Sequence, residues 1–206
     1  FAPPRTEDVI SQAGGGVDLE AELSWNYELG VRALPVRGLR VDATLFRDDY
    51  ENQVVPASLA GGVGATLTNG GETLHEGLEL GVRLDTGTLT GSPHNVFVRG
   101  AFTWLPVARF EGARFSIVPG SASVSVGGNR LPYAPETLLT FAGGYTHPRG
   151  FIAQVEAVHV GEQFTDDLNS VAAPADGQRG LIPGHTICNV AVSWDLRKVT
   201  LFVTAK

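Results

Sequence analysis

Five polar side chains assigned to the long, glycine-rich loops of the chain are the first candidates for ligand binding. An arginine guanidinium can hold a carboxylate through two parallel hydrogen bonds, so arginines in such segments suit an anionic ligand. For each residue taken singly, the alternative is a charge that only meets water. The five candidates are Arg109, Arg114, Arg130, Gln163 and Arg179.

The sequence contains no pattern for catalysis and none for a bound cofactor. Ser121 and Ser123 lie in a Pro-Gly-Ser-Ala-Ser segment that lacks the G-x-S-x-G turn of a serine hydrolase. The glycine-rich run at 61–64 lacks the Lys-Ser/Thr pair of a phosphate-binding loop. We therefore predict no catalytic residue and no cofactor.

Metal-binding patterns are also weak. The five histidines are scattered, and the single cysteine, Cys188, excludes a multi-cysteine zinc site and an internal disulfide. Asp166, Asp167 and Asp176 could bind Ca²⁺ through oxygen atoms, but a solvated acidic loop is the simpler interpretation. We predict no protein ligand to a metal.

Composition narrows the class of protein. The 206 residues carry a formal net charge of -7, which argues against nucleic-acid binding. Hydrophobic residues make up 43%, too many for a disordered chain. No run approaches the ~18 apolar residues of a membrane helix. Because the chain has no Met and opens on Phe-Ala-Pro-Pro, we expect a piece of a longer protein.

Apolar and polar residues alternate with period two in eight segments, which predicts eight strands with one apolar and one polar face each. Short links alternate with long ones along the chain. Successive links of an up-and-down meander lie at opposite ends of the sheet, so all the short links would lie at one end and all the long links at the other. The short links are near Leu34–Gly38, Thr86–Asn95, His147–Gly150 and Asp195–Lys198, and the long ones near Val54–Glu72, Glu111–Pro135 and Asp166–Pro183.

This sorting by length favours a membrane barrel over a soluble sandwich. Barrels in outer membranes have short periplasmic turns, long extracellular loops and aromatic residues at strand ends, here including Trp25, Trp104 and Trp194. The polar face is crowded with charge and glycine. We predict an all-β, antiparallel, up-and-down transmembrane β-barrel, with eight strands present as an arc of a larger barrel. On the apolar face, Cys188 is expected to be a small lipid-facing hydrophobe.

Several segments of the chain, taken in order, resemble segments of one protein family. The chain is similar to TonB-dependent outer-membrane receptors, nearest to the ferric dicitrate receptor branch. The segments are Phe1–Pro4, Glu20, Ser24–Arg32, Leu45–Gln53, Gly71-Glu72, Glu76–Glu79, Leu131–Glu136, Pro183–Ile187 and Leu201–Lys206.

This resemblance implies a barrel of about 22 strands filled by an N-terminal plug domain. Residues 1–206 would be the C-terminal part of that barrel, without the plug, the early strands and the final strand. The implied partners are outer-membrane lipid, the plug, a ferric chelate, and TonB, which would pair with an N-terminal box. Iron would arrive already chelated.

Charged residues on the polar face are expected to line the lumen. The resemblance implies that they contact the plug; the alternative is that they only solvate a water-filled lumen. They are Glu28, Arg32, Arg40, Asp42, Glu79, Arg83, Arg99 and Glu156, with Asp48 and Asp85 beside them.

The resulting prediction is a non-enzymatic part of a receptor in the bacterial outer membrane. It would serve active uptake of an iron chelate, either ferric citrate or a siderophore. The alternatives are a passive porin-like channel and a secreted β-sandwich that binds carbohydrate. The sequence does not name the chelate, since relatives carry cobalamin, nickel or sugars.

Overall fold

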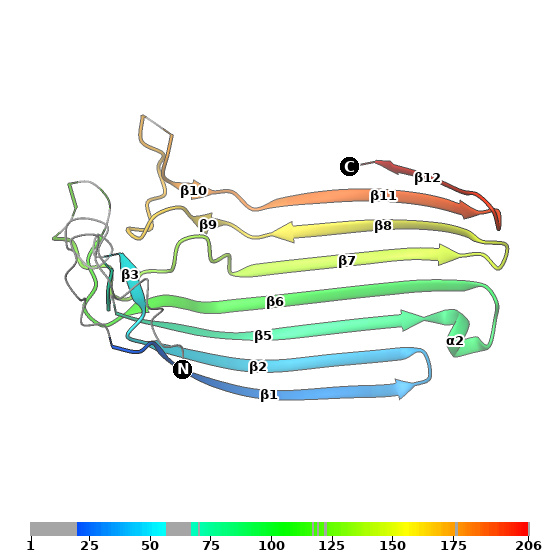
Figure 1. Cartoon of the computed structure of the whole chain (residues 1–206), viewed down its shortest axis with the longest axis horizontal. Coiled ribbons are helices and arrows are strands. Elements are labelled where there is room, and N and C mark those ends of the chain that lie inside the picture. The colour runs from blue at the N-terminus through cyan, green and yellow to red at the C-terminus, as the bar shows by residue number, and fades with distance from the viewer. Residues whose placement is uncertain are drawn as a thin grey trace.

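The computed structural model describes residues 20–56, 67–69, 71–116, 118, 120–121, 123–175 and 177–205. One antiparallel sheet of eight strands forms the body, in the order β1-β2-β5-β6-β7-β8-β11-β12 (Figure 1). The predicted meander of eight strands is confirmed. The strands are β1 (Leu23–Val36), β2 (Leu39–Glu51), β5 (Glu72–Asp85), β6 (Asn95–Glu111), β7 (Thr137–Thr146), β8 (Phe151–Val160), β11 (His185–Asp195) and β12 (Thr200–Ala205).

Short turns lie at one end of the sheet and long loops at the other, as the alternation of link lengths predicts (Figure 1). Two small hairpins lie within the loops: β3 (Val54–Pro56) with β4 (Leu67–Asn69), and β9 (Gln163–Phe164) with β10 (Leu181–Ile182). A five-residue helix, α2 (Thr86–Thr90), occupies one turn. These elements are too short to leave a periodic pattern in the sequence.

Strand register separates the two faces of the sheet. Leu29 pairs with Leu45, and Leu45 pairs with Leu78, so apolar side chains align across strands. Leu29 is 75% exposed and Leu45 is 56% exposed. A continuous apolar face of this kind is unfavourable in water and suits the lipid-facing wall of a membrane barrel. The sheet is open, with β1 and β12 at its edges, so the chain forms an arc and not a closed barrel.

The opposite face is charged. Asp42 lies between Arg32 and Arg40, with N–O distances of 2.5 and 2.8 Å, and Arg83 contacts Asp85 at 2.9 Å. The pairing registers of successive strands put the whole predicted lumen set, including Glu28, Glu79, Arg99 and Glu156, on this polar face. Contact with a plug remains a prediction.

The small hydrophobic core lies mostly at the loop end. Leu74, Ala108, Phe110, Val118 and Val126 are buried there, each at most 6% exposed. Among the described residues, no helix is long and apolar enough to cross a membrane.

A bulge interrupts the pairing of β5 with β6. Glu76 pairs with Val107 and Leu78 with Trp104, so β6 has one residue more than β5 between these pairs. The extra stretch contains Pro106, which has no N–H to donate and is therefore tolerated at such a position. On the polar face, Gly77 lies against the bulge. A Cβ at Gly77 would lie 2.6 Å from the Phe46 ring and from the Trp104 carbonyl oxygen.

The assignment of faces predicts opposite results at two adjacent positions of β5. Leu80→Arg puts a charge on the lipid face, where it costs about 2–4 kcal/mol near the bilayer centre. Gly81→Arg puts the same side chain on the polar face and should be milder. Folding yields of the full-length protein in lipid vesicles measure the difference; equal yields would contradict the assignment.

Close packing at the bulge predicts that Gly77→Ala impairs assembly, because overpacking costs about 1–3 kcal/mol. Gly81→Ala is the matched control, since a Cβ there would lie 3.6 Å from the nearest atom, in Asp42. Heat-modifiability on gels reports the folded fraction of each variant. A Gly77→Ala receptor that melts like the Gly81→Ala receptor would show that the bulge can adapt.

Candidate functional site

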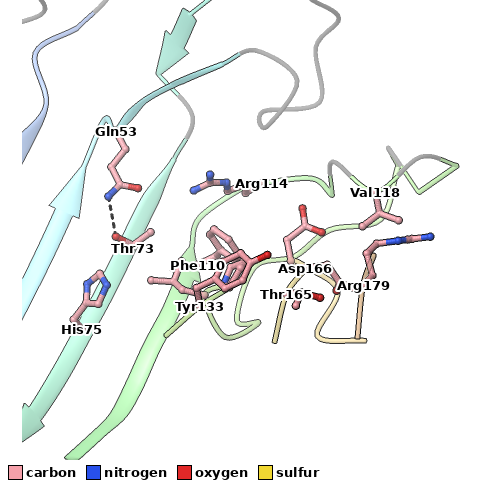
Figure 2. A pocket seen from close by; sticks show the side chains of 13 residues that line it. Gln53, Thr73, His75, Phe110, Arg114, Val118, Tyr133, Thr165, Asp166 and Arg179 are labelled. Carbon is pink, nitrogen blue, oxygen red and sulfur yellow. Dashed lines mark hydrogen bonds between the residues drawn. The ribbon is translucent and has the colours of Figure 1, made fainter. Parts of the chain in front are cut away.

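A cavity of about 570 Å³ opens at the loop end, on the polar side of the sheet (Figure 2). This volume lies within the range of ligand pockets in proteins. Strands β5 and β6 supply one wall, together with Gln53 from the link after β2, and the loops after β6 and β8 supply the rest. The cavity is therefore placed where the sheet meets the long loops.

The strand wall combines polar and aromatic side chains. Thr73 pairs with Phe110 in the register of β5 and β6, so both face the cavity side. The Gln53 side-chain amide donates a hydrogen bond to the Thr73 hydroxyl at 3.1 Å. His75 also lines this wall, with its ring edge-on to Tyr50 at 5.7 Å between centroids.

The loop after β6 folds back along that strand. The amide of Leu131 donates to the Ala108 carbonyl at 2.8 Å, and the amide of Phe110 donates to the Asn129 carbonyl at 3.0 Å. This return places the Arg114 guanidinium 4.3 Å from the centre of the Phe110 ring, a favourable cation–π contact. Burial lowers the pKa of Arg114, while the nearby Asp167 carboxylate acts in the opposite direction.

The loop after β8 is fastened to the loop after β6. The Asn169 side chain accepts a hydrogen bond from the Arg130 amide and donates one to the Arg130 carbonyl, both at 2.8 Å. Asn169 has a φ of 55°, a conformation that asparagine tolerates better than most residues. The Asn129 side-chain NH₂ donates to the Asp167 carbonyl, and the Ser116 hydroxyl donates to the Asp167 carboxylate at 2.7 Å. We call the Asn169–Arg130 pair of bonds the loop clamp.

Arg130 stabilises the bulge with its side chain. Its guanidinium donates to the carbonyls of Leu105 and Ala134, both at 2.7 Å, and of Pro106 at 3.3 Å. Burial lowers the pKa of Arg130, with Glu136 opposing. The side chain therefore holds main-chain oxygens that regular strand pairing leaves open.

The five residues predicted to bind a ligand do not lie together in the structure. Arg114 and Arg179 line the cavity, whereas Arg130 binds carbonyls and Gln163 lies in β9, paired with Ile182. Arg109 is not in a loop, so that placement is wrong: it lies in β6, on the apolar face of the sheet, bonded to Glu111 at 2.7 Å. Strand pairing continues past the apolar band, which the hydropathy pattern does not reveal.

Other cavity residues were not singled out as ligand contacts. Phe110, Thr73 and His75 lie in no binding motif, Tyr133 lies in a segment that carries only the family resemblance, and Asp166 is predicted only as a possible Ca²⁺ ligand. Within the described residues, no group of three His, Cys, Asp or Glu side chains could hold a metal ion. Asp176 and residues 61–64 lie outside the described residues.

Asp166 is buried, at 6% exposure. Its Oδ1 accepts hydrogen bonds from the amides of Leu168 and Ser170, at 3.0 and 3.1 Å. Its Oδ2 has no hydrogen-bond partner among the described residues, and neither has Nδ1 of His75. Buried polar atoms are nearly always bonded, so these two atoms have room for a partner, either water or a ligand, as has Oδ1 of Asn189 outside the cavity.

An antiparallel meander with an apolar face, a charged face and loops sorted by length is part of the wall of an outer-membrane β-barrel. The family model for the TonB dependent receptor-like beta-barrel matches residues 1–206. The chain belongs to this family, whose members are outer-membrane proteins.

Solved structures agree with the family. The ferric citrate transporter FecA is 28% identical, with a TM-score of 0.66 over 85% of this chain and 24% of its own. The siderophore receptor PirA from Acinetobacter baumannii is 16% identical, with a TM-score of 0.66 over 93% of this chain and 28% of its own. The ferric-catecholate receptor Fiu from E. coli K12 is 20% identical, with a TM-score of 0.62 over 98% of this chain and 25% of its own. The chain thus spans about a quarter of these receptors.

The loop clamp predicts that Asn169→Ala loosens both loops. The change leaves the amide and carbonyl of Arg130 without these partners, a loss of about 1–3 kcal/mol of local stability. Hydrogen exchange at the amides of 128–131 should accelerate. Ser170→Ala is the control, because no hydrogen bond of its hydroxyl to a described residue is seen. Unchanged exchange in Asn169→Ala would show that the loops hold together without the clamp.

Proposed function

We propose that the chain is part of a TonB-dependent receptor that takes up an iron chelate across the bacterial outer membrane. Two observations support the uptake of iron: membership of the family, and 28% identity to a ferric citrate transporter. The cavity at the loop end is the observation that carries the proposal for this segment. The long loops would then face the outside of the cell.

In this proposal the segment supplies one wall of the binding site. The strand wall and the two fastened loops form a fixed concave surface, and the rest of the receptor closes the site from the other side. Arg179 and Arg114 offer positive charge, and Phe110 and Tyr133 offer aromatic surface. A chelate bound here would contact loops and lumen wall together.

The charged face of the sheet is proposed to hold the plug domain. Pairs such as Arg32 with Asp42 and Arg83 with Asp85 are partly exposed in this arc, so their remaining donors and acceptors are accessible to a second domain. A plug seated against these pairs would shield them from water, and separating charges that are shielded in this way is unfavourable, so plug release would depend on force. TonB, acting through the N-terminal box, would supply that force.

The test uses the full-length receptor in cells without other iron-uptake receptors. Phe110→Ala combined with Arg179→Gln should weaken binding of the transported ferric chelate at least tenfold, because each bond to a charged group contributes about 1.5–3 kcal/mol. Radioactive iron uptake from ferric citrate and from a panel of ferric siderophores is the measurement, with surface level checked by antibody.

Arg149→Gln is the matched control, since Arg149 lies in the short turn between β7 and β8, at the opposite end of the sheet. It should leave uptake unchanged. Uptake that persists after the inner-membrane proton gradient is collapsed would indicate a passive channel and contradict the proposal.

A further inference from the structure

The free oxygen of Asp166 constrains what the cavity can bind. The side chain is held in place because Oδ1 accepts two main-chain hydrogen bonds, from Leu168 and Ser170. Oδ2 is buried beside the cavity and accepts none from the described residues. A carboxylate oxygen only accepts hydrogen bonds, so its natural partner is a donor on the ligand.

The charges around the cavity are balanced. Arg114 and Arg179 face two carboxylates, Asp166 and Asp167. The charge of Arg114 is offset by Asp167, which interacts with it electrostatically. Arg179 forms no ion pair with a described residue, and Figure 2 shows it on the same side of the cavity as Asp166. Among the described residues, Arg179 and the free oxygen of Asp166 therefore remain for the ligand.

The middle of the cavity is apolar. Figure 2 shows the Phe110 and Tyr133 rings between the strand wall, with Thr73 and His75, and the loop wall, with Asp166. On the loop wall, Asp166 has an oxygen without a hydrogen bond, and Arg179 has no ion pair with a described residue. A ligand with anionic oxygens on all sides would bring like charge against Asp166, which selects against it.

We propose that the cavity recognises a chelate bearing a pendant hydroxyl or ammonium group next to a carboxylate. The donor would bind Oδ2 of Asp166, and the carboxylate would bind Arg179. This inference rests on the proposed function. It names the chemical class of the substrate: an iron chelate with a hydroxy- or aminocarboxylate arm that does not bind the iron.

The test compares three ferric trihydroxamates that differ in one pendant arm. The arms are malyl, which has a hydroxyl beside its carboxylate, O-methylmalyl, which has lost the donor, and succinyl, which lacks the oxygen. The full-length receptor should bind the malyl chelate about tenfold or more tighter than the other two, the gain expected for one hydrogen bond to a charged group.

Asp166→Asn keeps an oxygen for the two main-chain bonds and replaces the free oxygen with an NH₂ donor. It should abolish the preference for malyl over O-methylmalyl, because an NH₂ donates equally to a hydroxyl or an ether oxygen, while both arms bind more tightly than succinyl. The gain of O-methylmalyl over succinyl is one that a misfolded receptor would not show. Asp195→Asn is the control, because Asp195 also accepts a main-chain hydrogen bond, from Arg197, at the other end of the sheet.

The outcomes separate the two proposals. If all three chelates bind equally, or if Asp166→Asn keeps the malyl preference, the inference about the donor is overturned while chelate uptake stands. If none of the three binds, the inference is overturned, and if the Phe110→Ala, Arg179→Gln receptor also transports every ferric chelate normally, the proposed function is overturned with it. A malyl preference over O-methylmalyl that Asp166→Asn abolishes supports the inference.

Discussion

The structure depends on one constraint: in hydrocarbon, a main-chain N–H or C=O has no water to bond with, so it must bond to a neighbouring strand. This requirement keeps the eight strands of the main sheet in continuous antiparallel register and fixes which side chains meet lipid. It also explains why the arc is incomplete as a membrane wall, since β1 and β12 each leave one edge unpaired. Those edges must pair with further strands before the sheet can reside in a bilayer.

Beyond the apolar band, the main chain no longer has to bond to a neighbouring strand. There, side chains form hydrogen bonds with main-chain groups. Arg130 binds the carbonyls exposed by the bulge, and Asn169 binds the main chain of Arg130 from the next loop. The hydrophobic core gathers in this region, around Phe110 and Val126, and not within the sheet. The cavity follows from this change, because loops packed on a small core leave a concave surface above the strands.

The sequence predicts the eight strands, their faces and the sorting of the loops, because apolar and polar side chains alternate along a lipid-facing strand. It does not predict where β6 ends, since pairing continues through polar residues, and Arg109 was misplaced for that reason. The roles of Arg130 and Asn169 were equally hidden, because their partners are main-chain atoms that leave no mark in the sequence. Of the cavity, Arg114 and Arg179 could be anticipated from charge, but Asp166 could be identified only from its unbonded oxygen.

The loop clamp also bears on how such receptors diversify. Because Asn169 bonds to the main chain of Arg130, it recognises the path of the neighbouring loop and not its side chains. Exposed residues of the loop after β6 that make none of the contacts described above can therefore change during evolution, provided that the chain still returns along β6 in the same position. An insertion that shifts this return would deprive Asn169 of its partner, so changes of length in the two loops must be inherited together. New specificity would then arise by substitution within loops of matched length, or by transfer of both loops as one genetic unit.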